Sequence, residues 1–138
     1  MILNRTHFLR LLLFSGLIRV AYFLQHAGSI FFAKPLLDQH YYDLCARQLA
    51  EGGGSLIDGF RPLLYPALLS IFYRIDLHSG MVMALIAQHL LGIAMVALIA
   101  YLAAKLFNSS RAGIIAGLLF ALSAPPLYFE GELLITTL

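Results

Sequence analysis

Two long stretches of this sequence carry no charged side chain, and they limit the possible fold more than any other feature. Asp, Glu, Lys and Arg are absent between Asp76 and Lys105, and again between Arg111 and Glu130. A helix needs roughly 20 mostly apolar residues to cross the hydrocarbon core of a bilayer. The first stretch meets this length, and the second meets it only by using nearly all its residues. The chain is therefore predicted to be an integral, multi-pass membrane protein.

The composition agrees with a membrane protein and excludes several other classes. Hydrophobic residues make up 61% of the chain and charged residues 12%, whereas soluble domains are about half apolar and about a quarter charged. The net charge of +2 is weak, and the basic residues form no cluster, so we expect no nucleic-acid partner. Cys45 is the only cysteine, which rules out an intrachain disulfide. The histidines lack a ligand-like spacing, so no protein-only zinc site is expected.

We predict an all-α, polytopic helical membrane protein with a single membrane domain over residues 1–138. The predicted segments are a first span (8–33), an outer loop with interfacial helices (34–80), a second span (81–107), a cytoplasmic turn (108–111), a third span (112–129) and the start of a truncated fourth span (133–138). Arg5 and Arg10 lie at the N-terminal end of the first span and no clear cleavage site follows, which indicates an uncleaved signal anchor.

Small and cyclic residues mark the third span. Gly113 and Gly117 form a GxxxG pattern, which allows close packing between helices. Pro125 and Pro126 should end this span, because proline cannot continue a helix from within.

The outer loop contains a second apolar segment, "DGFRPLLYPALLSIFYRI" at residues 58–75. Pro62 is suited to open a helix, since its missing N–H has no partner at that position anyway. The segment between Arg61 and Arg74 is too short to span a bilayer. It is predicted to be a helix in the membrane interface, anchored at its ends by Arg and Tyr.

The distribution of basic residues predicts the topology. The N-terminal tail and the 105–111 turn carry basic residues and no acid, whereas the loop from 34 to 76 holds both signs. The tail and the turn should therefore be cytoplasmic. The outer loop, Glu130 and Glu132 should share the outer side of the membrane.

A polar island, "PLLDQHYYDLCARQLAEGGG" at residues 35–54, interrupts the apolar sequence. If residues 38–51 form a helix, Asp38 shares a face with Tyr42 and with apolar side chains. Asp38 is then either a helix N-cap or a partly desolvated catalytic carboxylate at the membrane surface. The residues of the island alone leave both open.

Asp43 and Arg47 fall on another face of this helix at i, i+4 spacing, which favours weak pairing. We expect Asp43 to be a solvated partner of Arg47. Near the outer end of the third span, Glu130 and Glu132 are two residues apart. On a helix they cannot both face one site, and either one can also act as an interfacial cap.

Arg19 lies near the middle of the first span. An arginine at mid-bilayer costs roughly 2.5–3.5 kcal/mol on insertion scales. Arg19 should therefore face a partner helix or a polar cavity, where a structural ion pair and a ligand contact are both open.

The order and spacing of these motifs resemble the N-terminal part of the GT-C membrane glycosyltransferases. The branch is the one similar to protein O-mannosyltransferases and lipid A aminoarabinose transferases. The resemblance covers most of the chain from Arg19 onward. It is carried by Asp38, Tyr42, Ala46 and Leu49, by "FRPLLYPALLSIFY" (60–73), by Gln88, by "AKLFNSSRAGIIAGLLFAL" (104–122) and by "GELL" (131–134).

The resemblance implies a transfer of a sugar from a polyprenyl-phosphate donor to a hydroxyl on a lipid, glycan or protein acceptor. Asp38 would act as the general base, with inversion at the anomeric carbon. Arg61, and second Arg19, would stabilise the leaving phosphate, and Tyr42 would contact the substrate. Glu132 would orient the acceptor or, in metal-using members, help to hold a divalent cation. The site would lie on the outer face of the bacterial inner membrane.

The chain departs from the family pattern in two ways. Leu63 stands where the family has the second proline of its double proline. Family members also have more spans than this sequence supplies. The resemblance therefore implies a fragment, and we expect the isolated chain to be inactive.

Two other functions remain open at this point. The chain can be a small non-catalytic membrane protein that packs against a larger partner. It can also be a transporter segment that uses Arg19 and the acidic residues along a polar path.

Overall fold

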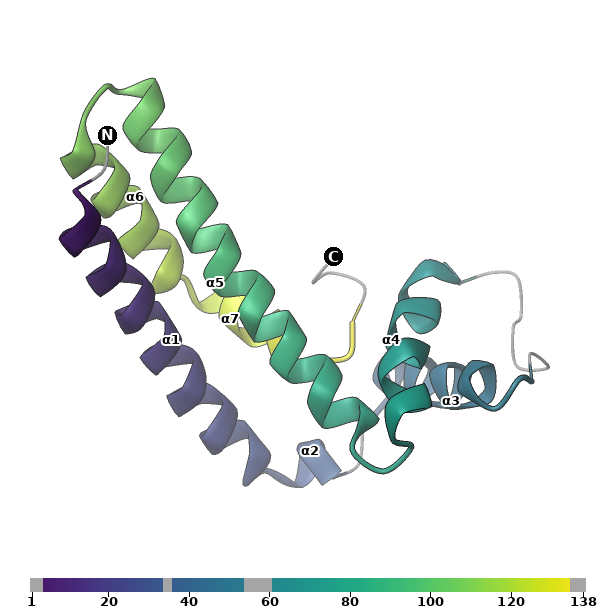
Figure 1. The fold of residues 1–138 in the computed structure, drawn as a ribbon. Helices are drawn as coiled ribbons and strands as arrows, with labels where there is room; N and C mark the ends of the chain where they lie inside the picture. Colours follow the sequence, from purple (N-terminus) through teal and green to yellow (C-terminus); the bar gives the residue numbers. More distant parts are fainter. Residues whose placement is uncertain (1–3, 34–35, 54–60, 135–138) are drawn as a thin grey trace. The chain divides into compact units, whose positions relative to one another are not determined.

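The computed structural model describes residues 4–33, 36–53 and 61–134. These residues form seven helices and no strand, which confirms the all-α prediction. In chain order the helices are α1 (Arg5–Ala27), α2 (Ile30–Ala33), α3 (Asp38–Ala50), α4 (Leu64–Ile75), α5 (Gly80–Leu106), α6 (Ser110–Ala121) and α7 (Ala124–Glu130) (Figure 1).

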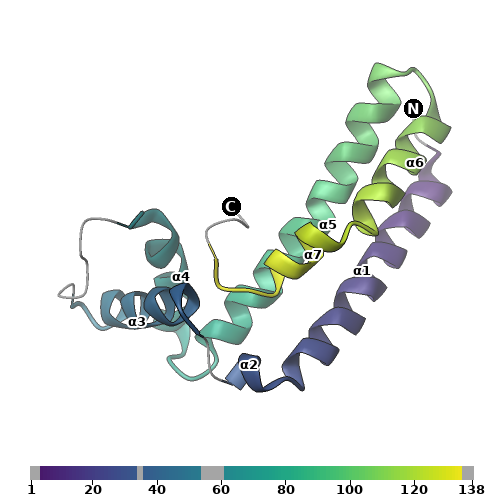
Figure 2. The same ribbon diagram turned by 180° about the vertical axis from the view of Figure 1, so that it is seen from behind.

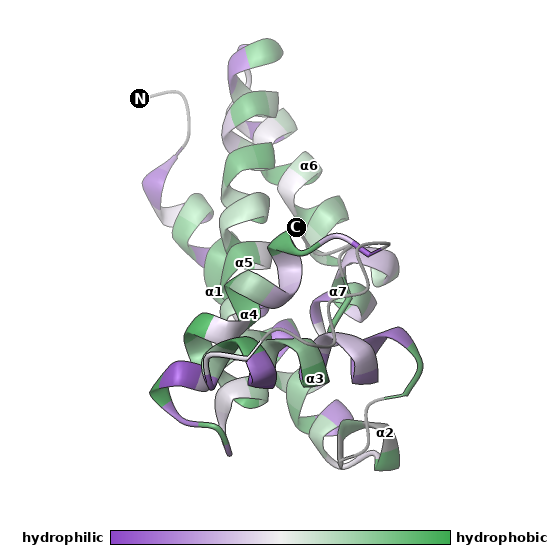
Figure 3. Ribbon diagram, turned by 90° about the vertical axis from the view of Figure 1, so that its right-hand side faces the viewer, coloured by the Kyte–Doolittle hydropathy of each residue, from purple (hydrophilic) through white to green (hydrophobic). Residues whose placement is uncertain are grey.

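Two of these helices, α1 and α5, are long and apolar enough to cross a membrane. The pair formed by α6 and α7 is bent by 55° at a short break, and it adds a third span if the two helices are counted as one. Hydrophobic residues dominate α5 and α6, which are mostly green in Figure 3. The described residues are therefore consistent with a membrane protein of two or three spans.

The first predicted span is shorter than expected. It was predicted to run from 8 to 33, but α1 ends at Ala27 and the short α2 begins at Ile30. The break lies at Gly28 and Ser29. Glycine is unfavourable in a helix interior, and the Ser29 hydroxyl oxygen accepts a hydrogen bond from the N–H of Phe32 at 3.3 Å. The serine thus starts a new helical turn and does not continue α1.

The third predicted span is also interrupted, and the role expected for its prolines was wrong. Pro125 and Pro126 do not end the helix that precedes them, because α6 already ends at Ala121. They lie in the first turn of α7, where a missing N–H costs no helical hydrogen bond. In the predicted fourth span, Leu133 and Leu134 are not helical, and residues 135–138 lie outside the described residues.

The chain divides into two compact units. Unit 1 comprises Met1–Gln25 and His89–Tyr128, and unit 2 comprises His26–Gln88 and Phe129–Leu138. In unit 1, α1, α6 and the part of α5 from His89 onward lie side by side (Figures 1 and 2). The buried core of unit 1 consists of Leu11, Val96, Ala100 and Ala121.

The GxxxG pattern of α6 lies in this core, as its sequence suggested. Gly113 and Gly117 are both buried. A Cβ atom at Gly117 would lie 2.6 Å from Leu11 Cδ2 and 3.0 Å from Ala100 Cβ. Such distances are too short for carbon atoms, so the absence of a side chain at Gly117 allows α6 to approach both α1 and α5.

We expect Gly117→Leu to destabilise unit 1 by about 1–3 kcal/mol, because the added carbons must displace Leu11 and Ala100. The matched control is Gly16→Ala in α1. There the new Cβ would lie 3.7 Å from Ile93 Cδ1, which is an ordinary contact, and alanine favours a helix by about 0.5–1 kcal/mol over glycine. Thermal unfolding in detergent micelles measures both. Equal stability of the two variants would contradict this packing.

The two basic segments of unit 1 lie at one end of it. The N–H of Asn4 donates to the Ser110 hydroxyl oxygen at 3.2 Å, so the start of α1 lies beside the start of α6. Arg5 follows Asn4 in the sequence, and Arg111 follows Ser110. Ser109 caps α6 by accepting a hydrogen bond from the N–H of Ala112 at 3.4 Å.

Unit 2 is built on the packing of α3 against α4, which lie side by side in Figures 1 and 2. The buried faces are Tyr42, Cys45 and Ala46 on α3, and Tyr65, Leu69 and Tyr73 on α4. The rings of Tyr42 and Tyr65 meet edge to face, with centroids 5.2 Å apart, an arrangement that aromatic quadrupoles favour. This pair fixes the register of the two helices.

The turn between α4 and α5 is closed by Asp76. Its carboxylate accepts hydrogen bonds from the hydroxyl of Ser79 and from the backbone N–H of Ser79, the latter at 2.9 Å. These bonds favour the ionised form, so the pKa of Asp76 lies below its ordinary value. Asp76 therefore serves to start α5.

Candidate functional site

Asp38 is the first residue of α3. The residue that precedes the helix is Leu37, and α3 has no side-chain capping bond, so Asp38 is not an N-cap. Its side chain is 56% exposed, and Oδ1 lies 3.1 Å from a guanidinium nitrogen of Arg61. The Asp38 carboxylate is therefore partly exposed and paired with Arg61 at the surface of unit 2.

Arg61 combines two contacts at this surface. Besides its ion pair with Asp38, its guanidinium lies over the ring of Tyr41, 4.3 Å from the centroid. The stacking restrains the arginine through the attraction between a cation and the negative face of the ring. Exposed ion pairs of this kind contribute only about 0–1 kcal/mol to stability, so the pair places a carboxylate and a guanidinium side by side without being needed for the fold.

Glu132 lies near Asp38 in space although it is far away in sequence. The side-chain amide of Gln39 donates a hydrogen bond to Glu132 Oε2, and the two residues are 93 positions apart. Gln39 directly follows Asp38. Glu132 is only 6% exposed. The structure thus brings both acidic positions of the sequence analysis to the start of α3.

Glu130 takes a different place from Glu132. It is the last residue of α7 and is as buried as Glu132. The backbone carbonyls of both residues accept hydrogen bonds from Gln88. Glu132 lies outside the helices, so the geometric limit that holds for two glutamates on one helix does not apply. The side chain of Glu132 accepts a hydrogen bond from Gln39 of α3.

Tyr42 and Arg19 are both buried. Tyr42 is 5% exposed and lies in the packed interface of α3 and α4, so its ring supports the fold. Arg19 belongs to unit 1, is 2% exposed and donates to the Ser15 hydroxyl oxygen at 2.6 Å. The prediction that Arg19 does not face lipid is confirmed by this burial.

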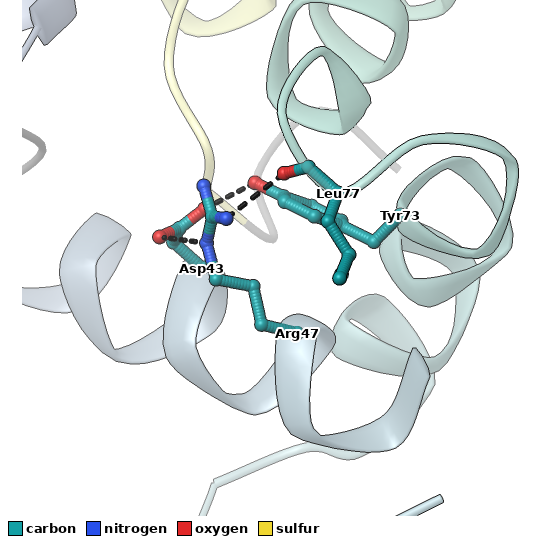
Figure 4. Close-up of polar contacts among 4 residues, drawn as sticks. All are labelled: Asp43, Arg47, Tyr73 and Leu77. Atoms are coloured by element: carbon teal, nitrogen blue, oxygen red, sulfur yellow. Dashed lines mark hydrogen bonds and ion pairs between the residues drawn. The ribbon is translucent and has the colours of Figure 1, made fainter. Parts of the chain in front are cut away.

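A second polar cluster holds α3 against α4 (Figure 4). The carboxylate of Asp43 accepts hydrogen bonds from Arg47 Nε at 2.9 Å and from the hydroxyl of Tyr73. Arg47 also donates to the carbonyl of Leu77 at 2.9 Å. The predicted pairing of Asp43 with Arg47 is confirmed, but its predicted solvation is wrong, because Asp43 is only 8% exposed. The ring of Tyr73 from α4 covers this face of α3.

The charges of this cluster are fixed by its hydrogen bonds. Burial, followed by the hydrogen bond to Asp43, raises the pKa of Tyr73 well above its ordinary value, so its hydroxyl stays a donor. The hydrogen bond that Arg47 donates to Asp43 also raises the pKa of Arg47. Both helices are therefore joined by a carboxylate with two permanent donors.

The residues that the structure describes do not supply a metal site. Among them, no three His, Cys, Asp or Glu side chains gather closely enough to hold an ion. The divalent cation that the resemblance allows has no such ligand set here, and we derive no step through a metal.

Three of the residues that build this site were not assigned a role from sequence. Gln88 has a detectable signal, since a lone amide in an apolar helix must find hydrogen-bond partners. Gln39 and Tyr73 have no such signal in the sequence, because their roles depend on contacts with distant segments.

No protein-family model matches the chain, and comparison with curated proteins and with solved structures finds no similar protein.

Proposed function

We propose that this chain is the N-terminal part of a GT-C glycosyltransferase of the bacterial inner membrane, with its active site on the outer face of that membrane. The enzyme to which it belongs transfers a sugar from a polyprenyl-phosphate donor to a hydroxyl of a lipid, glycan or protein acceptor. The observation that carries the proposal is the grouping at the start of α3. Asp38 lies beside the guanidinium of Arg61, and its neighbour Gln39 binds Glu132.

Asp38 is the general base of the proposed reaction. Its carboxylate is more than half exposed and forms an ion pair with Arg61. The acceptor hydroxyl approaches within about 2.6–3.2 Å of the carboxylate, the range for proton transfer. As the hydroxyl oxygen bonds to the anomeric carbon, the bond to phosphate breaks, its electron pair stays on the phosphate, and Asp38 takes the proton. Attack opposite the leaving group inverts the configuration.

Arg61 stabilises the phosphate in this proposal. Guanidinium groups bind phosphate oxygens through two parallel N–H bonds, which lysine cannot do. The charge that develops on the leaving phosphate is then met by a fixed cation. Arg61 is 36% exposed beside Asp38, so one surface presents the base and the cation together.

The exposed face of α4 supports a position in the membrane interface. Four large apolar side chains on one helical face are exposed, namely Leu64, Leu68, Ile71 and Ile75. Their spacing follows the helical repeat, and the opposite face packs on α3. With 12 residues, α4 is too short to span a bilayer. A helix of this kind lies in the plane of the interface, where a polyprenyl phosphate has its head group.

The ends of unit 1 support the proposed topology. Arg5 and Arg111 follow two residues that are hydrogen-bonded to each other, Asn4 and Ser110. Under the positive-inside rule this end is cytoplasmic.

Binding of polyprenyl monophosphate to the purified chain in nanodiscs of neutral lipid tests the proposal. This lipid is released from every polyprenyl-phosphate sugar donor when the sugar is transferred. We expect saturable binding that Arg61→Gln weakens about tenfold, since a hydrogen bond to a charged group contributes about 1.5–3 kcal/mol. Arg74→Gln is the matched control, because Arg74 is an exposed arginine of α4 that contacts the Leu49 carbonyl.

The uncharged polyprenol of the same length provides the second control. It should bind only weakly and with no dependence on Arg61. Equal binding of polyprenol and polyprenyl phosphate, or equal effects of the two arginine substitutions, would overturn the proposed phosphate site.

A further inference from the structure

Gln88 is a buried amide in the apolar helix α5. Its side chain is 6% exposed. Oε1 accepts a hydrogen bond from the hydroxyl of Tyr65 at 3.0 Å, and Nε2 donates to the backbone carbonyls of Glu130 at 3.1 Å and Glu132 at 3.0 Å. Carbonyls only accept, so the nitrogen must face them. The amide therefore has a fixed orientation, with both of its N–H groups in use.

The two carbonyls bound by Gln88 belong to the turn that follows α7. This helix ends at Glu130, and the last carbonyls of a helix have no partner within it. Gln88 supplies that partner for Glu130 and binds Glu132 with its second N–H. The N–H of Glu132 in turn donates to the Phe129 carbonyl at 3.2 Å. The backbone on both sides of Gly131 is thus held in one conformation.

The position of this turn decides where the Glu132 side chain lies. Its carboxylate accepts a hydrogen bond from the side chain of Gln39, the residue after Asp38. If the turn moved, this contact would be lost, because Glu132 belongs to no helix that would hold it otherwise.

We propose that Gln88 is a positioning residue, which acts through the 130–132 turn to hold the carboxylate of Glu132 at the start of α3. This inference rests on the proposed function, in which the Glu132 carboxylate orients the acceptor hydroxyl beside Asp38. Tyr65 is part of the same device, since its hydroxyl fixes the amide of Gln88. The chain of contacts runs from α4 through α5 to the 130–132 turn and then to α3.

Carbon NMR of the chain with ¹³Cδ-labelled glutamate in nanodiscs tests this inference without any need for activity. The sequence has three glutamates, Glu51, Glu130 and Glu132, so the spectrum is simple, and Glu132→Gln assigns the resonance of interest. We expect Gln88→Met, which removes the donor at similar volume, to move the Glu132 resonance. Gln39→Leu should move it in the parent chain but should have no further effect in the Gln88→Met background.

Two controls separate positioning from loss of folding. The Glu51 resonance should not move, because Glu51 is exposed at the end of α3. Gln25→Met, at an exposed glutamine of α1, should leave the Glu132 resonance in place. If Gln88→Met also moves the Glu51 resonance, Gln88→Leu is measured in its place. If both variants move the Glu51 resonance, the role of Gln88 is structural and the proposal is overturned.

The inference is overturned if Glu132 does not move in a folded Gln88 variant, or if Gln39→Leu has the same effect in both backgrounds. The functional part has its own readout. In membranes that transfer sugar, Gln88→Met should raise KM for the acceptor and leave KM for the donor unchanged. Equal changes in both KM values would overturn this part. Absence of transfer in the parent, with the NMR result as expected, would instead overturn the proposed function and leave the positioning of Glu132 supported.

Discussion

Asp38→Asn is expected to lower the rate of sugar transfer by about 10²–10⁴-fold, the usual contribution of a general base. Asparagine has the shape of aspartate and retains an oxygen that can accept a hydrogen bond from Arg61. It cannot take a proton from the acceptor hydroxyl. Binding of polyprenyl phosphate should therefore remain while transfer is lost. The measurement is the initial rate of transfer in membranes from the organism that makes this chain, with the substitution introduced in its gene.

Asp76→Asn is the matched control for this experiment. Asp76 is an exposed aspartate of the same unit, and its contacts are with the turn before α5. Its substitution should leave transfer unchanged. If Asp38→Asn also left transfer unchanged, the chain would be better described as a non-catalytic membrane protein that packs against a larger partner.

The second large effect concerns stability. We expect Asp43→Ala to destabilise the α3–α4 pair by on the order of 3 kcal/mol. A buried polar group that loses its partner costs about 1–3 kcal/mol, and more if it is charged. The substitution removes the acceptor for both Tyr73 and Arg47. Arg47 is 38% exposed at its side chain, so water replaces part of its lost contact and the main cost falls on Tyr73.

Asp43→Asn and Tyr73→Phe separate the contribution of the Asp43 acceptor oxygens to stability from that of the Tyr73 hydroxyl. Asparagine keeps one acceptor oxygen and should cost less than alanine. Tyr73→Phe removes the donor together with the need for an acceptor, so its cost should be about 1 kcal/mol, the net contribution of a typical hydrogen bond. Hydrogen exchange of the α3 and α4 amides measures each change. An Asp43→Ala variant as stable as the parent would show that this cluster does not hold the two helices together.

The helices themselves follow from sequence patterns that act over short distances. The charge-free run from 77 to 104 predicts α5, and the polar island predicts α3 almost to its observed ends. Pro62, at the start of an apolar segment, predicts α4. In each case one property, either hydropathy or a helix-starting residue, dominates the local free energy. The break at Gly28 was missed because a single glycine in an apolar run is compatible with a continuous helix.

The directions of the side chains depend on tertiary packing, which the sequence pattern does not contain. Asp38 and Asp43 lie on one helix, and the sequence placed Asp38 on the face shared with Tyr42 and apolar side chains and Asp43 on a solvated face. The structure contradicts the solvation of Asp43, because Tyr73 of α4 covers it, and it pairs Asp38 with Arg61 at the surface of unit 2. Likewise, the contact between Gln39 and Glu132 joins segments 93 residues apart, and no local pattern predicts it.

The most direct test of the proposed function follows the anomeric carbon of the donated sugar. Membranes from cells that make the chain, and from cells that lack it, are supplied with a polyprenyl-phosphate sugar labelled with ¹³C at that carbon. The account predicts that the label moves to an acceptor hydroxyl with inverted configuration only where the chain is present, with release of an equal amount of polyprenyl phosphate. Equal transfer in both membranes, or retention of configuration, would contradict it.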